Sequence, residues 1–90
     1  MPDPKKLKVG DLVRFVSLPE EWKNPEYVVQ EESIEFMKIM VSRKWPSRVH
    51  EVDEWGFPWI AARVKEKGRI VRHTWGILEK TGWRLVRRRV

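Results

Sequence analysis

The sequence lacks cysteine and has only two histidines among its 90 residues. The absence of cysteine excludes disulfide bonds, thiolate metal ligands and thiol nucleophiles. His50 is followed by Glu51 but not by a second histidine three residues later, so the zinc-protease helix pattern is absent. We therefore expect no metal site, and we expect His73 to be a packed residue with one ring nitrogen bonded to the backbone.

Catalytic and targeting motifs are missing as well. There is no Gly-x-Ser-x-Gly turn and no glycine-rich phosphate loop, and Asp53 and Glu54 are adjacent, so on a strand they would face opposite sides. The N-terminal residues lack the apolar run of a signal peptide, and no segment approaches the roughly 20 apolar residues that span a bilayer. We expect a cytoplasmic, non-enzymatic protein with no cofactor and no membrane contact.

What the chain has instead is positive charge, concentrated at one end. Nineteen Lys and Arg residues oppose thirteen Asp and Glu residues, which gives a net charge of +6. Residues 61 to 90 hold ten basic residues against two acidic ones, so this third alone carries +8. Such asymmetry can attract nucleic acid, an anionic lipid surface or an acidic protein patch, although solvent-facing strands could show the same composition.

Large side chains must supply the core of a chain this short, and six Trp, three Phe and one Tyr residues are available. We expect one domain over residues 9 to 90, after a flexible leader over residues 1 to 8 that lacks apolar periodicity. The first strand is expected over residues 12 to 17, where Val13 and Phe15 alternate with a charged residue.

The segment from residue 33 to 44 fits either a helix or a strand. As a helix it would have Ser33 as its N-cap and a broad apolar face. As a strand, its odd-numbered apolar residues would share one side. The unbranched methionines favour the helix, which would end before the Trp45-Pro46 bond.

The second half of the chain is predicted to form a series of short strands. We expect them over residues 48 to 54, 58 to 65, 69 to 78 and 83 to 87. The uneven spacing of Val49 and Val52 indicates a bulge in the first of these. The joins end in Gly56, Gly68 and Gly82, and glycine adopts the left-handed conformation of tight turns without steric cost. The pattern therefore predicts a meander of four strands joined by tight hairpins.

The register of the two longest strands follows from burial. The apolar face is expected to combine Ile60, Ala62 and Val64 with Val71, His73 and Trp75. This pairing points Arg72 to solvent, whereas a slip of one residue would bury it. We also expect Trp75 and Trp83 to lie mostly in the core.

Two groups of side chains in this region could bind a partner. Trp55, Phe57 and Trp59 surround a rigid turn and could form either an aromatic platform or the lid of the core. The candidate nucleic-acid-binding set is Arg63, Lys65, Lys67, Arg69, Arg72 and Arg84, with Trp55 and Trp59 as stacking surfaces. Phosphate contacts need positive charge at suitable spacing, and aromatic rings can stack on exposed bases. Residues 87 to 89 form a basic tail beyond this set.

The order of elements resembles an SH3-like small barrel. Gly10-Asp11-Leu12-Val13 is similar to the first strand of KOW-type and Tudor-type barrels, and it is followed by a long connection and a tight meander. Gly56-Phe57-Pro58-Trp59, followed by His73 and Trp83, resembles small bacterial proteins to which no activity is attached. The resemblance implies a mainly β fold of about five antiparallel strands, with a helix inserted after the first strand. A methyl-lysine cage of the Tudor kind would bring together Trp22, Trp55 and Phe57.

We therefore expect a monomeric binding module whose partner is nucleic acid, contacted through the basic hairpin. The alternative is a protein-interaction or structural module that uses the aromatic hairpin around Gly56. An exposed aromatic rim flanked by arginines would favour nucleic acid, whereas an apolar patch away from the charges would favour a protein partner.

Overall fold

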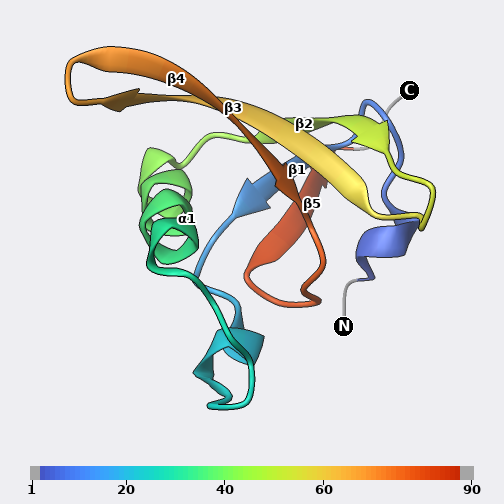
Figure 1. The fold of residues 1–90 in the computed structure, drawn as a ribbon. Helices are drawn as coiled ribbons and strands as arrows, with labels where there is room; N and C mark the ends of the chain where they lie inside the picture. Colours follow the sequence, from blue (N-terminus) through green and yellow to red (C-terminus); the bar gives the residue numbers. More distant parts are fainter. Residues whose placement is uncertain (1–2, 88–90) are drawn as a thin grey trace.

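A computed structural model of the protein describes residues 3 to 87 and shows one antiparallel sheet with one long helix (Figure 1). The strands are β1 (Leu12–Phe15), β2 (Ser47–Val52), β3 (Pro58–Glu66), β4 (Arg69–Gly76) and β5 (Trp83–Arg87). Helix α1 (Glu31–Arg43) lies between β1 and β2, and the short 3-10 helices are η1 (Pro4–Lys6) and η2 (Glu20–Lys23). The mainly β fold with a helix inserted after the first strand is confirmed. Its relationship to SH3-like barrels stays a prediction, and residues 88 and 89 of the basic tail lie outside the described residues.

The strands are arranged in the order β4-β3-β2-β1-β5, with every neighbouring pair antiparallel. β2, β3 and β4 form the expected meander, but the last join is not a hairpin, because β5 pairs with β1 and places Trp83 opposite Phe15. The carbonyl of Gly82 accepts a hydrogen bond of 2.8 Å from the N–H of Val16. A Cβ atom at Gly82 would lie 2.8 Å from the carbonyl oxygen of Ser17. The prediction of a four-strand meander is therefore wrong, because this glycine closes a turn against the end of β1.

The β3–β4 hairpin has the predicted register. Ile60 lies opposite Trp75, Ala62 opposite His73, and Val64 opposite Val71. The turn residues Lys67 and Gly68 have φ angles of 48° and 79°, the pattern of a two-residue hairpin turn that matches strand twist. The far half of the hairpin projects beyond the rest of the molecule (Figure 1).

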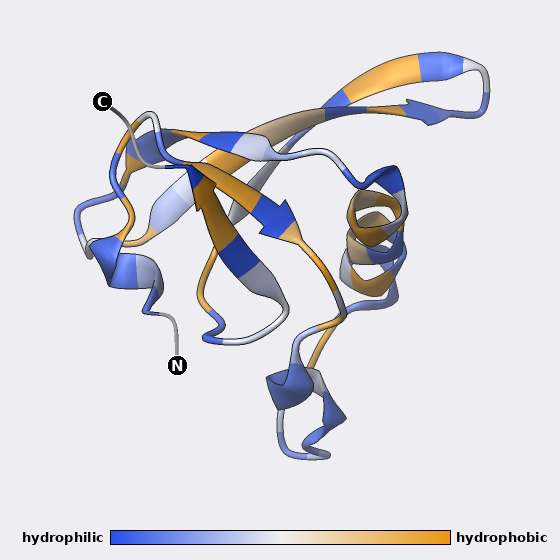
Figure 2. Cartoon of the chain, turned by 180° about the vertical axis from the view of Figure 1, so that it is seen from behind, coloured by the Kyte–Doolittle hydropathy of each residue, from blue (hydrophilic) through white to orange (hydrophobic). Residues whose placement is uncertain are grey.

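The core lies between the inner face of the sheet and α1. Val13, Val49 and Ile60 are fully buried on the sheet side. Helix α1 contributes Phe36, Met37 and Met40, and Figure 2 shows hydrophobic and hydrophilic residues alternating around this helix. Val49 and Val52 flank a register shift in β2, so the predicted bulge is confirmed, although Val52 is exposed. Trp83 is in the core. Trp75 is partly buried and packs against the core.

Helix α1 begins earlier than expected. Its N-cap is Gln30, which makes no side-chain capping bond, so the prediction of Ser33 as N-cap is wrong. The acidic residues Glu31 and Glu32 occupy the first turn, where the helix dipole favours negative charge. The helix ends at Arg43, and its C-cap residue Lys44 has a left-handed conformation with φ 62°. No helix within residues 3 to 87 has the length and apolarity needed to cross a bilayer.

The described part of the N-terminal leader packs on the domain. Leu7 is only 4% exposed and belongs to the core. Asp3 caps η1 by accepting a hydrogen bond of 3.0 Å from the N–H of Lys5. The ammonium of Lys5 lies 4.9 Å from the ring centroid of Phe57. A single buried leucine therefore packs this part of the expected leader onto the domain, although the segment has no apolar periodicity.

Candidate functional site

The β3–β4 hairpin carries an arginine pair on its outer face. Residues directly opposite each other in an antiparallel pair share a face. Arg63 lies opposite Arg72, and Lys65 lies opposite Ile70 on the same face. The buried residue Val64 points the other way, so this face is turned away from the core. Three predicted cations therefore lie together on one solvent-facing surface.

The other predicted cations lie elsewhere. Lys67 is a turn residue, and Arg69 lies opposite Glu66 on the opposite face of the hairpin. Arg84 is in β5, at the other edge of the sheet from β4, where it faces Arg14 of β1. The structure therefore divides the predicted set of six cations among four places: the outer face, the turn, the opposite face of the hairpin and β5.

Arg14 is a functional candidate that sequence reasoning missed. Its neighbours Val13 and Phe15 are buried, so Arg14 points to the outer side of the sheet and forms a second cross-strand arginine pair with Arg84. Its Nε atom is buried and has no hydrogen-bond partner within the described part of the chain. Between the two arginine pairs lies β2, whose exposed Arg48 adds a further cation. The strand pattern could have placed Arg14 outward, but its pairing depends on the unpredicted contact between β1 and β5.

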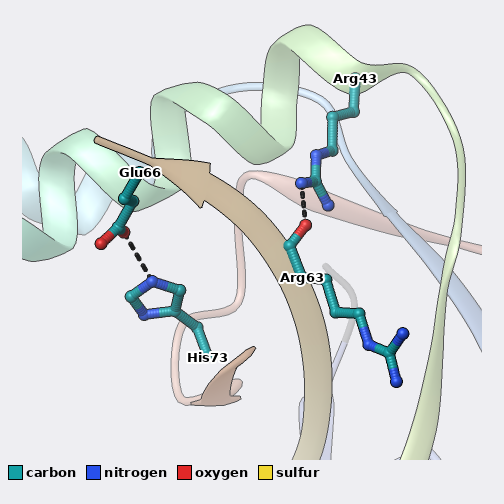
Figure 3. Close-up of polar contacts among 4 residues, drawn as sticks. All are labelled: Arg43, Arg63, Glu66 and His73. Carbon is teal, nitrogen blue, oxygen red and sulfur yellow. Dashed lines mark hydrogen bonds and ion pairs between the residues drawn. The ribbon is translucent and has the colours of Figure 1, made fainter. Parts of the chain in front are cut away.

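The paired arginines lack acidic partners. None of Arg14, Arg63, Arg72 and Arg84 forms an ion pair with a carboxylate of residues 3 to 87. Like charges directly opposite each other destabilise a sheet unless something neutralises them. The guanidinium of Arg43 does not belong to either arginine pair. It donates a hydrogen bond to the backbone carbonyl of Arg63 (Figure 3). The outer face is therefore a surface on which the paired arginines form no ion pair with the described chain, and the carboxylate on β2 nearest to it is that of Glu51, opposite Trp59.

His73 forms the ion-pair contact found within residues 3 to 87. Its Nε2 atom lies 2.6 Å from Oε1 of Glu66, on the face of the hairpin turned toward α1 (Figure 3). Its ring centroid lies 5.1 Å from that of Phe36. The prediction of a ring nitrogen bonded to the backbone is wrong, because Glu66 lies further along the same face and reaches the ring. No group of three or more potential metal ligands occurs among the described residues.

The turn between β2 and β3 is organised by Asp53. One carboxylate oxygen accepts bonds from the N–H groups of Trp55 (3.0 Å) and Phe57 (2.9 Å), and the other accepts from the indole N–H of Trp59 (2.9 Å). The indole bond is the largest cause that lowers the pKa of Asp53 below its ordinary value. Trp55 is 68% exposed, whereas Trp59 is partly buried. The two predicted stacking residues therefore differ, since Trp59 is held in place and Trp55 is free on the surface.

The proposed cage of Trp22, Trp55 and Phe57 does not form in the described residues. Trp22 packs instead against Trp75, with ring centroids 6.0 Å apart and planes at 62°. Both rings, together with Trp59, line a pocket of about 390 Å³ beside β4. The aromatic residues that converge are thus far apart in the sequence, between positions 22 and 75. Sequence spacing cannot predict contacts between residues so far apart.

Comparison of the chain with protein-family models, with curated proteins and with solved structures finds no match. Function must therefore be argued from the geometry of the outer face and of the pocket.

Proposed function

We propose that the protein is a small non-enzymatic module that binds nucleic acid through the outer face of its sheet. The observation that carries the proposal is the occurrence of two cross-strand arginine pairs, Arg63 with Arg72 and Arg14 with Arg84, that have no carboxylate partner among residues 3 to 87. A chain of phosphates would neutralise both pairs at once, since the pairs lie on one side of the sheet with β2 between them.

Trp59 adds a surface for stacking to this face. It lies on the same side of β3 as Arg63 and Lys65, because residues two apart on a strand share a face. One side of its ring covers Gly76, where a Cβ atom would lie 2.9 Å from the ring carbons. Its indole N–H is used by Asp53, so the ring is already oriented before a base arrives. Stacking on an oriented ring is tolerant of base identity, and we therefore propose binding with little sequence preference.

The test compares two triple variants that remove the same charge. In the first, Arg63, Lys65 and Arg72 of the outer face are changed to Gln. In the second, the exposed residues Lys23, Lys38 and Lys80, which lie in other parts of the molecule, are changed to Gln. Fluorescence anisotropy with labelled single-stranded and duplex oligonucleotides, at about 50 and about 200 mM salt, measures affinity and its salt dependence.

The outer-face variant should bind at least about tenfold more weakly, with a salt slope smaller by about 2 to 3. The control variant should lose much less affinity, because long-range attraction alone is screened over about 10 Å at such salt concentrations. Equal losses in the two variants would show that only net charge matters, and that result would contradict a defined binding face.

A protein-interaction role is the second candidate, and the exposure of Trp55 supports it. This ring is 68% exposed at the turn around Gly56, and large exposed aromatic side chains are enriched at protein interfaces. If Trp55 anchors a self-association, sedimentation of the wild type should depend on concentration and that of Trp55→Ala should not. A monomer mass at all concentrations would leave Trp55 available only for other partners.

A further inference from the structure

Half of the backbone polar groups of β4 point away from the sheet. The N–H of Ile77 donates to the carbonyl of Pro58 at 2.9 Å, which makes Trp59 and Gly76 a non-hydrogen-bonded pair. Hydrogen-bonded and non-hydrogen-bonded pairs alternate along an antiparallel ladder. The residues whose N–H and C=O groups face the open edge are therefore Ile70, Arg72, Thr74 and Gly76. No other residue in the described part of the chain bonds to these groups.

The base of this open edge borders the pocket of about 390 Å³, which we call the edge pocket. Thr74, Trp75 and Gly76 line it from β4, and residues 28 to 30 line it from the chain that leads into α1. Gln30 is extended, with φ −72° and ψ 148°. The edge pocket is therefore bounded by an unpaired strand edge and by the segment that leads into α1, which is extended at Gln30.

Tryptophan rings lie on both faces of the sheet at this edge. Trp59 belongs to the outer face and covers Gly76, whereas Trp75 belongs to the inner face and packs against Trp22. Successive side chains of an extended peptide point to opposite sides. A strand added beside Thr74 and Gly76 would thus place one side chain on Trp59 and the next on Trp22 and Trp75.

The charged group that lines the edge pocket is the carboxylate of Glu79, a residue only 7% exposed. The hydroxyl of Tyr27 donates to its Oε2 atom at 2.6 Å. A carboxylate can accept about four hydrogen bonds, so this contact leaves acceptor capacity. No lysine or arginine is among the lining residues. A carboxylate beside several aromatic rings provides electrostatic attraction for a cation with an apolar stem.

A second carboxylate fixes this end of the edge pocket. Glu21 accepts a hydrogen bond of 2.6 Å from the N–H of Lys80 and another from the hydroxyl of Thr81. Burial alone would raise the pKa of Glu21, but these bonds lower it below its ordinary value, so the group is held ionised. The pocket wall that carries Tyr27 is therefore pinned to the loop that carries Glu79.

We propose that the open edge of β4 binds an extended peptide segment of a protein partner as an added strand, with a lysine or arginine side chain of that segment directed to Glu79. Main-chain bonds to Thr74 and Gly76 would supply affinity, and the edge pocket would supply selectivity for a basic residue. A second copy of this chain is a poorer occupant, because paired β4 strands would bring Arg69 and Arg72 against further arginines. This proposal uses none of the cations of the outer face, so charge variants there separate it from the nucleic-acid surface, although both surfaces include the ring of Trp59.

The experiment uses the full chain, fluorescently labelled, on an array of heptapeptides. The central residue of each peptide is fixed as Lys, Arg, Glu, Leu or Pro, and the flanking positions are randomised. We expect capture by the peptides with central Lys or Arg, with β-branched residues enriched at the flanking positions. The best peptide is then titrated by NMR, where the amide protons of Thr74 and Gly76 and the indole protons of Trp59 and Trp75 should shift together.

Two further measurements separate strand addition from general attraction. Glu79→Gln, which keeps an acceptor for Tyr27, should weaken the basic peptide about tenfold, and the control Glu54→Gln, at the exposed turn outside the pocket, should not. Two versions of the best peptide, each N-methylated at one of the two alternating sets of residues, test the added strand directly. At least one of them should lose binding to the wild-type protein, and this result does not depend on the stability of any protein variant.

Several results would overturn the proposal. They are the absence of capture by any peptide, equal capture by peptides with central Glu, preference for Pro, and retention of binding by both N-methylated registers of the peptide. Choline chloride, titrated alone, is a further probe. If it shifted the indole protons while no peptide shifted Thr74 or Gly76, the edge pocket would be a site for small organic cations and not for a strand.

Discussion

The two ends of the β3–β4 hairpin differ in what surrounds them. At the base, Ile60 is fully buried, whereas near the turn Ile70 is 73% exposed, although both are isoleucines of one hairpin. Gly76 at the base lies under the ring of Trp59, whereas a Cβ atom placed on Gly68 at the turn would meet no other part of the chain within 4 Å. The base of the hairpin is thus part of the folded core, and its far half is a projecting arm. Outward side chains of this arm, such as Ile70, contribute little to stability and are free to serve binding, whereas the inward side chain of Val64 is buried.

The largest expected effect contrasts the two isoleucines. Ile60→Ala should lower the free energy of unfolding by about 2 to 5 kcal/mol, because it leaves a cavity in the core. Ile70→Ala should change it by less than about 0.5 kcal/mol, because its side chain is mostly in water. Urea unfolding of both variants gives the two values. Similar losses of unfolding free energy in the two variants would mean that the side chain of Ile70 is buried in solution.

A second contrast uses the two glycines. Gly76→Ala places a Cβ atom 2.9 Å from the Trp59 ring, which must move, and the expected destabilisation is about 1 to 3 kcal/mol. Gly68→Ala meets only the strain of its positive φ, about 1 kcal/mol. The sharper readout is the indole N–H resonance of Trp59, which should shift in Gly76→Ala and stay in place in Gly68→Ala. An unmoved indole resonance in both variants would contradict the packing described for the base.

A third prediction concerns the contact that closes the edge pocket. The hydrogen bond to Glu79, followed by burial, raises the pKa of Tyr27 to about 12 from its ordinary value of 10.0. Because the folded-state pKa is the higher one, the stabilisation is complete below about pH 10 and is lost as the pH rises towards 12. The chain has one tyrosine, so ultraviolet titration reports this group alone. Glu79→Gln should return the pKa towards 10.0, and a wild-type value already near 10.0 would contradict the contact.

The smallest expected effect lies at the hairpin turn. Lys67 has φ 48°, a conformation that asparagine adopts more easily than lysine. Lys67→Asn should therefore raise the free energy of unfolding by about 0.5 kcal/mol. Because Lys67 lies beyond the arginine pair, nucleic-acid affinity should fall only slightly. A loss of affinity as large as that of the outer-face triple variant would move the binding surface to the turn.

The sequence predicted the hairpin well because its determinants are local. Alternation through Ile60, Ala62 and Val64 marks one face, and a glycine turn two residues long fixes which residues lie opposite. The helix was favoured correctly for the same reason, but its start was misplaced. Ser33 is a good capping residue, yet a suitable residue type does not show which position ends the preceding extended chain.

The contacts that the sequence did not predict join distant segments. Gly82 indicates a turn but not the strand that the turn leads to, so the pairing of β5 with β1 and the Arg14–Arg84 pair were missed. Leu7 is an isolated apolar residue in a charged segment, and no periodicity identifies it as part of the core. The edge pocket combines Trp22 with Trp75, and only the tertiary structure brings these rings together.

The most direct test of the central claim is an NMR titration of the wild-type protein with short single-stranded and duplex oligonucleotides at low and high salt. We predict saturable shifts at the amides of Arg63, Lys65 and Arg72 and at the indole N–H of Trp59, with weaker binding at high salt. The absence of shifts, or shifts confined to Trp22, Trp75 and the face turned toward α1, would contradict the assignment of the outer face as a nucleic-acid surface.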